Sequence, residues 1–199
     1  MAMVKQAERR AATRTAILDA AEQLFAEKGF EGTSTDAILS GAGISRGALY
    51  HHFETKQAVF EAVFLRASDA AIERALRTGR TGPDAAVSPL ESLIQVCFRW
   101  LREVRKPVVA AIVIEQGPQV LGWSRARDLE AGTSLGLMMR GLERAEDAGE
   151  IKLESVELAA RYLNAVLAEA ALAARHRPPG VTHAGIERSL RQVIEGMAS

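Results

Sequence analysis

The side chains with the clearest capacity for chemistry lie together in one short stretch, residues 41–56. Three apolar residues in it, Ile44, Leu49 and Phe53, recur at helical spacing and are expected to bury one face of a helix. The opposite face then carries a polar set: Arg46, Gly47, Tyr50 and, beside them, His51. Arginine commonly bonds bidentately to guanine in the major groove, and other polar side chains can hold phosphates. This stretch therefore predicts recognition of DNA.

The residues just before this face indicate how its helix is positioned. Gly43 can adopt the left-handed conformation that ends a preceding short helix, and the Ser45 hydroxyl can cap the start of the next one. A second helix of about eight residues would be roughly 12 Å long, close to the width of a major groove. Two short helices joined by a tight glycine turn describe a helix-turn-helix.

Each residue of this face has an expected task on DNA. Arg46 would read guanine, Gly47 would let the bases approach, and the methyl group of Ala48 would contact thymine. The polar groups around them would bind phosphates and set the register. Asp36 and Glu54 weaken the electrostatics and predict modest non-specific affinity. The full predicted DNA-contacting set is Ser34, Thr35, Ser45, Arg46, Gly47, Ala48, Tyr50, His51 and Lys56.

The same residues carry a family resemblance. Thr33 and Ser34, the run 42–53 (Ala-Gly-Ile-Ser-Arg-Gly-Ala-Leu-Tyr-His-His-Phe) and Lys56 resemble the DNA-binding signature of TetR-type, or tetracycline-repressor-like, transcriptional regulators. The resemblance covers about residues 10–60, and the rest of the chain is similar to the family only in helical layout and length. It implies a homodimeric, all-helical repressor whose larger domain binds a small molecule.

Local charge is a better indication of nucleic-acid binding than overall composition in this chain. The 199 residues include 25 basic and 25 acidic side chains, so the overall charge gives no indication of nucleic-acid binding. Residues 1–14 nevertheless carry four basic side chains against one acidic one, a net charge of +3. Such an arm is either a frayed terminus or a DNA contact.

The single cysteine, Cys97, excludes an intramolecular disulfide and lies in apolar sequence, where we expect a core thiol. No N-terminal apolar stretch indicates a signal peptide. The longest apolar run, residues 108–114, is far shorter than the ~20 residues of a membrane-spanning helix. We therefore expect a cytoplasmic protein without a membrane partner.

Helix signals are dense and strand signals scarce, which favours an all-α fold. We expect an N-terminal three-helix helix-turn-helix domain, residues 1–56, joined by a long helix to a C-terminal helical ligand-binding and dimerisation domain, residues 57–199. Thr33 and Asp36 have capping-box spacing and predict the start of the second helix. Outside the helix-turn-helix, the predicted helices cover about residues 9–28, 56–77, 89–106, 123–148, 156–175 and 184–197, with a proline- and glycine-containing linker over 78–89.

Three glycines lie inside the predicted helix over residues 123–148: Gly132, Gly136 and Gly141. Each costs roughly 0.5–1 kcal/mol relative to alanine. Close packing or room for a ligand would compensate, and a loose helix or a break near Gly132 is the alternative.

The larger domain is predicted to enclose a ligand pocket between the helices near residues 90–105, 107–117 and 123–148. Glu115, Gln116 and Asn164 are its expected polar anchors, because a buried polar side chain needs a partner. They could equally cap helices or bond one another. Few anchors among apolar walls suit an amphipathic organic effector. The expected wall is Cys97, Trp100, Leu101, Ile112, Trp123, Leu137, Met138 and Tyr162.

The last two helices are predicted to form a homodimer interface, because the apolar stripe of the final helix exceeds what a terminal helix needs to lie on its own domain and alanines of the preceding helix permit close approach. A stripe buried within the chain is the alternative. A two-fold dimer would require a pseudo-palindromic operator on double-stranded DNA. The predicted interface is Leu163, Val166, Leu167, Ala170, Ile186, Leu190, Val193, Ile194 and Met197.

Two other classes of protein compete with this interpretation. An enzyme or metalloprotein is disfavoured, because His51 and His52 point about 100° apart on a helix and His176 and His183 lack ligand partners at a suitable spacing. We expect no catalytic residue, cofactor or metal. A ligand-independent architectural DNA-binding dimer is the second alternative, and a tightly filled larger domain would favour it.

Overall fold

The computed structural model describes residues 2–77 and 87–197. These residues form helices and no strand, which confirms the predicted all-α fold. In chain order the elements are α1 (Ala2–Lys28), α2 (Thr35–Ala42), α3 (Arg46–His52), α4 (Lys56–Arg77), α5 (Pro89–Glu103), α6 (Pro107–Val109), the π-helix η1 (Ala110–Gln116), α7 (Gly117–Leu121), α8 (Trp123–Asp147), α9 (Val156–His176) and α10 (His183–Gly196).

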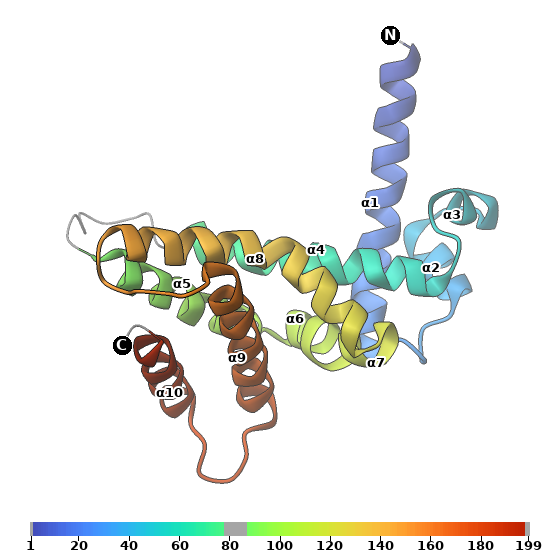
Figure 1. Ribbon diagram of the computed structural model, residues 1–199. Helices are drawn as coiled ribbons and strands as arrows, with labels where there is room; N and C mark the ends of the chain where they lie inside the picture. Colours follow the sequence, from blue (N-terminus) through green and yellow to red (C-terminus); the bar gives the residue numbers. More distant parts are fainter. Residues whose placement is uncertain (1, 78–86, 198–199) are drawn as a thin grey trace.

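The helices divide between two ends of the molecule (Figure 1). Helix α2 packs against α1 and α3 adjoins α2 at one end, while α5, α8, α9 and α10 gather at the other. Helix α4 runs through both groups and contacts α1 as well as α5 and α8. Where α4 meets α1, Phe60 packs edge-on against Phe25, with ring centroids 5.2 Å apart. The two ends therefore share one continuous apolar core.

Two features of the first helices differ from the prediction. Helix α1 begins at Ala2 and not near residue 9, because residues 2–9 contain no glycine or proline and consist mainly of good helix formers. The predicted capping box from Thr33 was wrong. Ser34 caps α2 and accepts a hydrogen bond from the Ala37 N–H at 3.1 Å, while the fully buried Thr33 hydroxyl donates to the Gly29 carbonyl at 2.8 Å and closes the end of α1.

The middle of the chain is more helical than its sequence predicts. The linker expected over residues 78–89 lies mostly outside the described residues, but the start of α5 is as predicted, with Ser88 as the cap and Pro89 at the first helical position. The apolar segment after Pro107 forms α6 and the π-helix η1. Gly117 follows, and a Cβ built there would lie 2.5 Å from the Phe64 ring, so only glycine lets η1 and α7 approach α4 this closely.

Helix α8 is continuous through its glycines. Close packing explains Gly141 alone, where a Cβ would lie 2.8 Å from Leu93 of α5. Gly132 has open space around it, so neither packing nor a helix break accounts for that residue.

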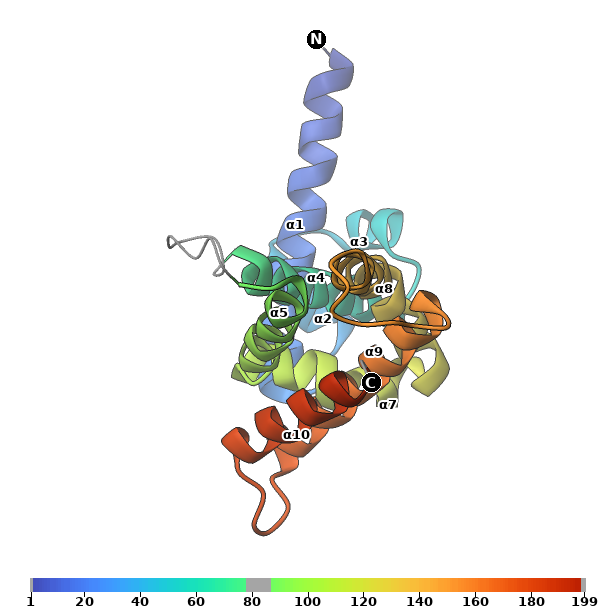
Figure 2. The same ribbon diagram turned by 60° about the vertical axis from the view of Figure 1, so that its left-hand side comes forward.

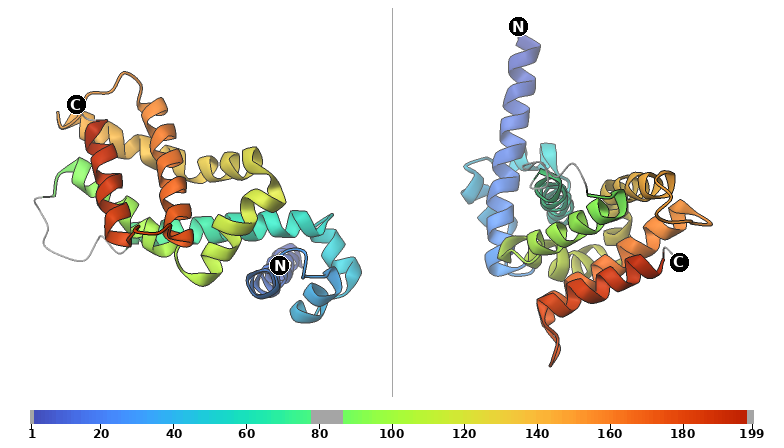
Figure 3. Two further views of the ribbon diagram at one scale, coloured as in Figure 1. Left: turned by 90° about the horizontal axis from the view of Figure 1, so that it is seen from below. Right: turned by 90° about the vertical axis from the view of Figure 1, so that its left-hand side faces the viewer.

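The last two helices pack side by side (Figure 3). The apolar stripe of α10 faces into the chain: Ile186, Leu190 and Ile194 are all buried. Leu163 and Leu167 of α9 are also buried. These five residues therefore belong to the chain's own core. A stripe buried within the chain was the alternative to the predicted dimer interface. No helix within the described residues is long and apolar enough to cross a membrane.

Candidate DNA interface and ligand cavity

The glycine turn between α2 and α3 has the predicted geometry. Gly43 lies in the left-handed region, with φ of 65°, and its N–H donates to the Leu39 and Ser40 carbonyls at the end of α2. A Cβ at Gly43 would contact no other part of the described chain, so the requirement for glycine here is one of backbone torsion and not of space. Two residues later Ser45 caps α3 and accepts a hydrogen bond from the Ala48 N–H at 3.3 Å.

Helix α3 separates its two faces as the spacing predicts. Leu49 is fully buried and Phe53, which ends the helix, is nearly so. Arg46, Gly47, Tyr50 and His51 are exposed, and Ala48 is half-buried. Apart from its own helix backbone and chain neighbours, no atom of the described residues lies within 4 Å of a Cβ built on Gly47, so this face is open to an incoming surface. The exposed face combines polar groups, which can bond bases and phosphates, with small residues, which allow a helix to approach the floor of a major groove.

Two residues of the predicted DNA-contacting set also cap helices. Ser34 and Ser45 are exposed, and each hydroxyl accepts a backbone N–H while its own hydrogen remains available to a phosphate oxygen. Thr35, the first residue of α2, is half-buried beside Ser34.

Arg46 has a partner that was not predicted from the sequence. Its Nη2 lies 2.5 Å from Oδ1 of Asp36 in the first turn of α2, and both side chains are largely exposed. This contact orients the Arg46 side chain. Because exposed ion pairs are weak, Arg46 remains able to bind DNA. Asp36 therefore acts directly on the predicted base-reading side chain.

Lys56 has an internal task in this structure. Its ammonium group donates to the Phe30 carbonyl at 2.8 Å and to the Thr33 carbonyl at 3.0 Å, and it lies 4.1 Å from the centroid of the Phe30 ring. These contacts tie the start of α4 to the turn between α1 and α2. The residue predicted as a phosphate contact thus holds together the loop that presents α2.

The basic arm predicted at the N-terminus is helical and adjoins α3. The first half of α1 projects away from the body of the molecule (Figures 1 and 2). The guanidinium group of Arg14 lies 5.2 Å from the centroid of the Phe53 ring. Burial, His51, Arg10 and Arg14 all lower the pKa of His52. Positive charge from α1 and α3 therefore gathers at one place.

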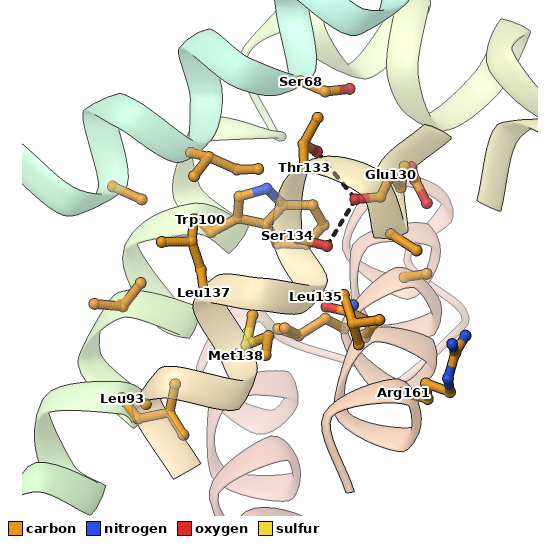
Figure 4. A pocket seen from close by; sticks show the side chains of 18 of the residues that line it. Ser68, Leu93, Trp100, Glu130, Thr133, Ser134, Leu135, Leu137, Met138 and Arg161 are labelled. Atoms are coloured by element: carbon orange, nitrogen blue, oxygen red, sulfur yellow. Dashed lines mark hydrogen bonds between the residues drawn. The ribbon is translucent and has the colours of Figure 1, made fainter. Parts of the chain in front are cut away.

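A cavity of about 690 Å³ opens in the larger domain between α4, α5, α8 and α9 (Figure 4). Five of the residues predicted to bind a ligand line it: Trp100, Leu137, Met138, Tyr162 and Asn164. The amide nitrogen of Asn164 is buried and has no hydrogen-bond partner among the described residues. The volume is within the range of small-molecule sites in proteins.

The other predicted ligand residues lie outside this cavity, for identifiable reasons. Glu115 forms an ion pair with Arg175, and the Gln116 amide donates to the Phe25 carbonyl at 2.9 Å. Trp123 is 55 % exposed on the outside of α8. The remaining three are buried in the core: Cys97, Leu101 and Ile112. Burial raises the pKa of the Cys97 thiol to about 12, as suits the core thiol predicted for it.

Polar residues of α4 and α8 that were not predicted from the sequence also line the cavity. These are Ser68, Arg127, Asp128, Glu130, Thr133, Ser134 and Arg144. A signal for Ser68 exists in the sequence, because it continues the buried row Phe60–Phe64 at four-residue spacing. A polar residue in a buried helical row is informative. Glu130 carries no comparable signal, since α8 has charged residues on several sides.

Part of the predicted dimer interface remains available on the surface. Val193 is 41 % exposed, and Val166, Ala170 and Met197 are partly exposed. Leu158 and Tyr162 continue the row of Val166 along α9 at four-residue spacing and are 51 % and 61 % exposed. The exposed apolar surface of the last two helices therefore centres on one face of α9.

Two family models match the chain. Residues 17–63 match the model described as bacterial regulatory proteins of the tetR family, and residues 90–197 match the tetracyclin repressor-like C-terminal domain. The first match contains the glycine turn and α3, and the second contains most of the cavity lining.

Individual proteins resemble the chain over most of its length. The transcriptional regulator UidR of Escherichia coli K12 is 31 % identical over 141 residues, covering 70 % of this chain and 69 % of UidR. The transcriptional repressor BepR of Brucella suis is 32 % identical over 163 residues, covering 79 % of this chain and 78 % of BepR. The crystal structure of RolR with its ligand resorcinol has a TM-score of 0.74 at 20 % identity, covering 97 % of this chain and 90 % of RolR, and shares the fold.

Proposed function

The chain belongs to the TetR family of bacterial regulatory proteins, and on that premise we propose that it is a sequence-specific transcriptional repressor. It binds a pseudo-palindromic operator as a homodimer and is released by a small amphipathic effector. The observation that carries this proposal is the exposed polar face of α3 behind a left-handed glycine turn, in the same chain as a cavity of about 690 Å³.

On DNA, Arg46 reads a guanine while Gly47 and Ala48 allow close approach. Tyr50, His51 and the capping hydroxyls of Ser34 and Ser45 hold phosphates, with Thr35 beside them. The basic residues of α1 add sequence-independent attraction. Lys56 contributes by fixing the loop before α2, through its two backbone carbonyl contacts.

The homodimer forms through the exposed row of α9 together with Val193 and Met197 of α10. Alanines next to this row, such as Ala170, permit close approach of two helices. Two-fold symmetry places the recognition helices about 34–36 Å apart or at a multiple of that distance, and this spacing requires an operator with two related half-sites.

Release by an effector requires that the effector bind better to a state in which the two α3 helices are wrongly spaced. Helix α4 connects the two regions: Ser68 lines the cavity, and Phe60, two turns earlier, packs against Phe25 of α1. A displacement of α4 at the cavity is therefore transmitted to the core of the DNA-binding end. RolR, which shares this fold, was crystallised with a small-molecule ligand.

The architectural alternative predicts a filled larger domain, and the cavity disfavours it. An enzymatic role has no support, because the relatives are named as transcriptional regulators. A repressor of this kind acts on chromosomal DNA, and we infer a cytoplasmic location from that role.

The test combines DNA selection with ligand release. An operator is first selected from random duplexes with the wild-type protein, and hydrophobic compounds are then screened for quenching of tryptophan fluorescence. Each compound that binds is tested for its effect on operator affinity. We expect a two-fold-symmetric site and at least one compound that weakens binding to it. Compounds that occupy the cavity tightly but leave operator affinity unchanged would contradict the release mechanism.

A further inference from the structure

One turn of α8 presents hydrogen-bond acceptors to the cavity. The hydroxyl groups of Thr133 and Ser134 donate to the Glu130 carbonyl oxygen at 3.0 and 2.8 Å (Figure 4). Their hydrogens are thus already engaged, and what each hydroxyl offers a ligand is a lone pair. Glu130 itself also lines the cavity, and its carboxyl group has no hydrogen bond or ion pair with the described residues. Three acceptors therefore lie within one helical turn.

The Glu130 carboxyl is mostly removed from water. Burial raises its pKa to about 7, and only the charge of Arg127, three residues earlier, lowers it. In the described part of the cavity wall, α4, α5 and η1 contribute no titratable side chain. Among the charged wall residues of α8 and α9, Arg161 is paired with Glu157, and Arg144 donates to the Arg140 carbonyl. The charged and titratable groups of the wall besides Glu130 are Arg127, Asp128, Arg144, Arg161 and Tyr162.

Two further polar groups in the wall are unpartnered. Ser68, on α4, is only 5 % exposed, and its hydroxyl oxygen has no hydrogen-bond partner among the described residues. The buried amide nitrogen of Asn164, on α9, likewise lacks one and can only donate. A buried polar group without a partner is costly, so both groups indicate a polar ligand atom between α4, α8 and α9.

We propose that the effector is an amphipathic organic cation, whose protonated amine donates to Glu130 and to the Thr133 and Ser134 hydroxyl oxygens while its apolar body lies against Trp100, Leu137 and Met138. An ammonium group supplies up to three donors and neutralises the carboxylate, whereas an alcohol supplies one donor and no charge. A carboxylate ligand would be repelled by Glu130. An acceptor elsewhere on the cation would satisfy Asn164. The biological meaning of this inference rests on the proposed release by an effector, but binding itself is measured without DNA.

The test uses three probes of one shape: phenylbutylamine, phenylbutanol and phenylbutyrate. Trp123 is replaced by Phe, which leaves Trp100 in the cavity wall as the only tryptophan and its quenching as the signal. We expect the amine to bind at least about tenfold more tightly than the alcohol, as for a charge-assisted hydrogen bond in a site with little water. Tighter binding of the alcohol or the butyrate than of the amine would overturn the proposal.

The Glu130→Gln variant separates the carboxyl from the rest of the wall. It should reduce amine affinity at least about tenfold and leave alcohol affinity within about threefold, and the alcohol result also shows that the cavity is intact. Glu143→Gln removes an exposed carboxylate from the same helix outside the cavity wall and should change neither affinity. An unchanged amine-to-alcohol ratio in Glu130→Gln would refute the assignment of Glu130.

The pH dependence of the wild-type protein gives a readout without any substitution at Glu130. The amine remains protonated, and only the deprotonated carboxyl pairs with it. With a pKa of about 7 in the free protein, the deprotonated fraction rises about tenfold between pH 6 and pH 8. Amine affinity should rise by the same factor while alcohol affinity stays level, and a flat profile for the amine would count against the proposal.

Operator affinity distinguishes this inference from the proposed function. If the amine binds through Glu130 but does not weaken operator binding, the inference stands and release by an effector fails. If a compound without an amine releases the operator and the amine does not bind through Glu130, release stands and the inference fails.

Discussion

The contact between Asp36 and Arg46 permits a sharp test of how the protein reads DNA. Arg46 has enough N–H donors to bond a guanine bidentately while its Nη2 keeps the 2.5 Å contact with Asp36, and this contact then orients the guanidinium group. The side chains are 61 % and 72 % exposed, so the pair contributes only about 0.2–1 kcal/mol. Asp36 also repels phosphates within about 10 Å at 0.1 M salt.

Asp36→Asn removes both effects and should raise affinity for scrambled duplex by about 1.4- to 5-fold, the factor equivalent to 0.2–1 kcal/mol. Affinity for the selected operator should rise less, because Arg46 is no longer held in position. Discrimination between the two duplexes therefore falls. Arg46→Ala should instead cost about 1–3 kcal/mol on the operator and relax one base position.

Fluorescence anisotropy of labelled duplexes at two salt concentrations measures all of these affinities. Glu73→Gln is the matched control, because it breaks an ion pair with Arg77 of similar exposure at the far end of α4. That variant should bind both duplexes as wild type does. The reasoning is refuted if Asp36→Asn behaves like Glu73→Gln, or if Arg46→Ala discriminates between operator and scrambled duplex as well as wild type.

Three further predictions concern stability and assembly. Lys56→Met leaves two carbonyls without their donor and should lower the free energy of unfolding in urea by about 1–3 kcal/mol. Lys106→Met removes an exposed ammonium from Glu103, which keeps its ion pair with Arg74, and should change the free energy of unfolding little. Gly117→Ala places a methyl group 2.5 Å from the Phe64 ring and should lower the free energy of unfolding by about 1–3 kcal/mol. Gly132→Ala has open space around it and should raise the free energy of unfolding by about 0.5–1 kcal/mol. Equal effects of the two alanines would contradict the packing argument. Leu158→Asp puts a charge on the exposed row of α9 and should give monomers in sedimentation, with the loop variant Val181→Asp remaining dimeric.

The DNA-binding end was predictable from the sequence because its determinants are local. Gly43, Ser45 and the spacing of Leu49 and Phe53 act within a few residues of one another, and the structure has each where the spacing predicts it. Lys56 was assigned a different task, because its partners are the Phe30 and Thr33 carbonyls, which lie more than 20 residues away in the chain. Neither carbonyl leaves a mark on the sequence around Lys56.

The cavity was predicted only in outline for the same physical reason. Its wall combines residues from α4, α5, α8 and α9 with Val113 of η1, and the side of each helix that faces it depends on packing between distant residues. Cys97 and Trp100 lie on the same helix, yet only Trp100 lines the cavity. Apolar periodicity identifies which residues are buried but does not distinguish those that face an empty volume from those that face the core.

The π-helix η1 gives the cavity a second connection to the DNA-binding end, besides α4. Val113 of η1 lines the cavity, and Gln116, three residues later, donates to the Phe25 carbonyl near the end of α1. Gly117 then packs against Phe64 of α4. An effector that displaces Val113 therefore acts on α1 and α4 together, and both carry the helix-turn-helix. Because a ligand shifts an equilibrium only by its differential affinity for the two states, the polar groups that distinguish them have to lie where the wall moves. Ser68 on α4 and Glu130 on α8 meet this condition, because each lies on a different helix of the wall and neither has a partner among the described residues that would hold it in place.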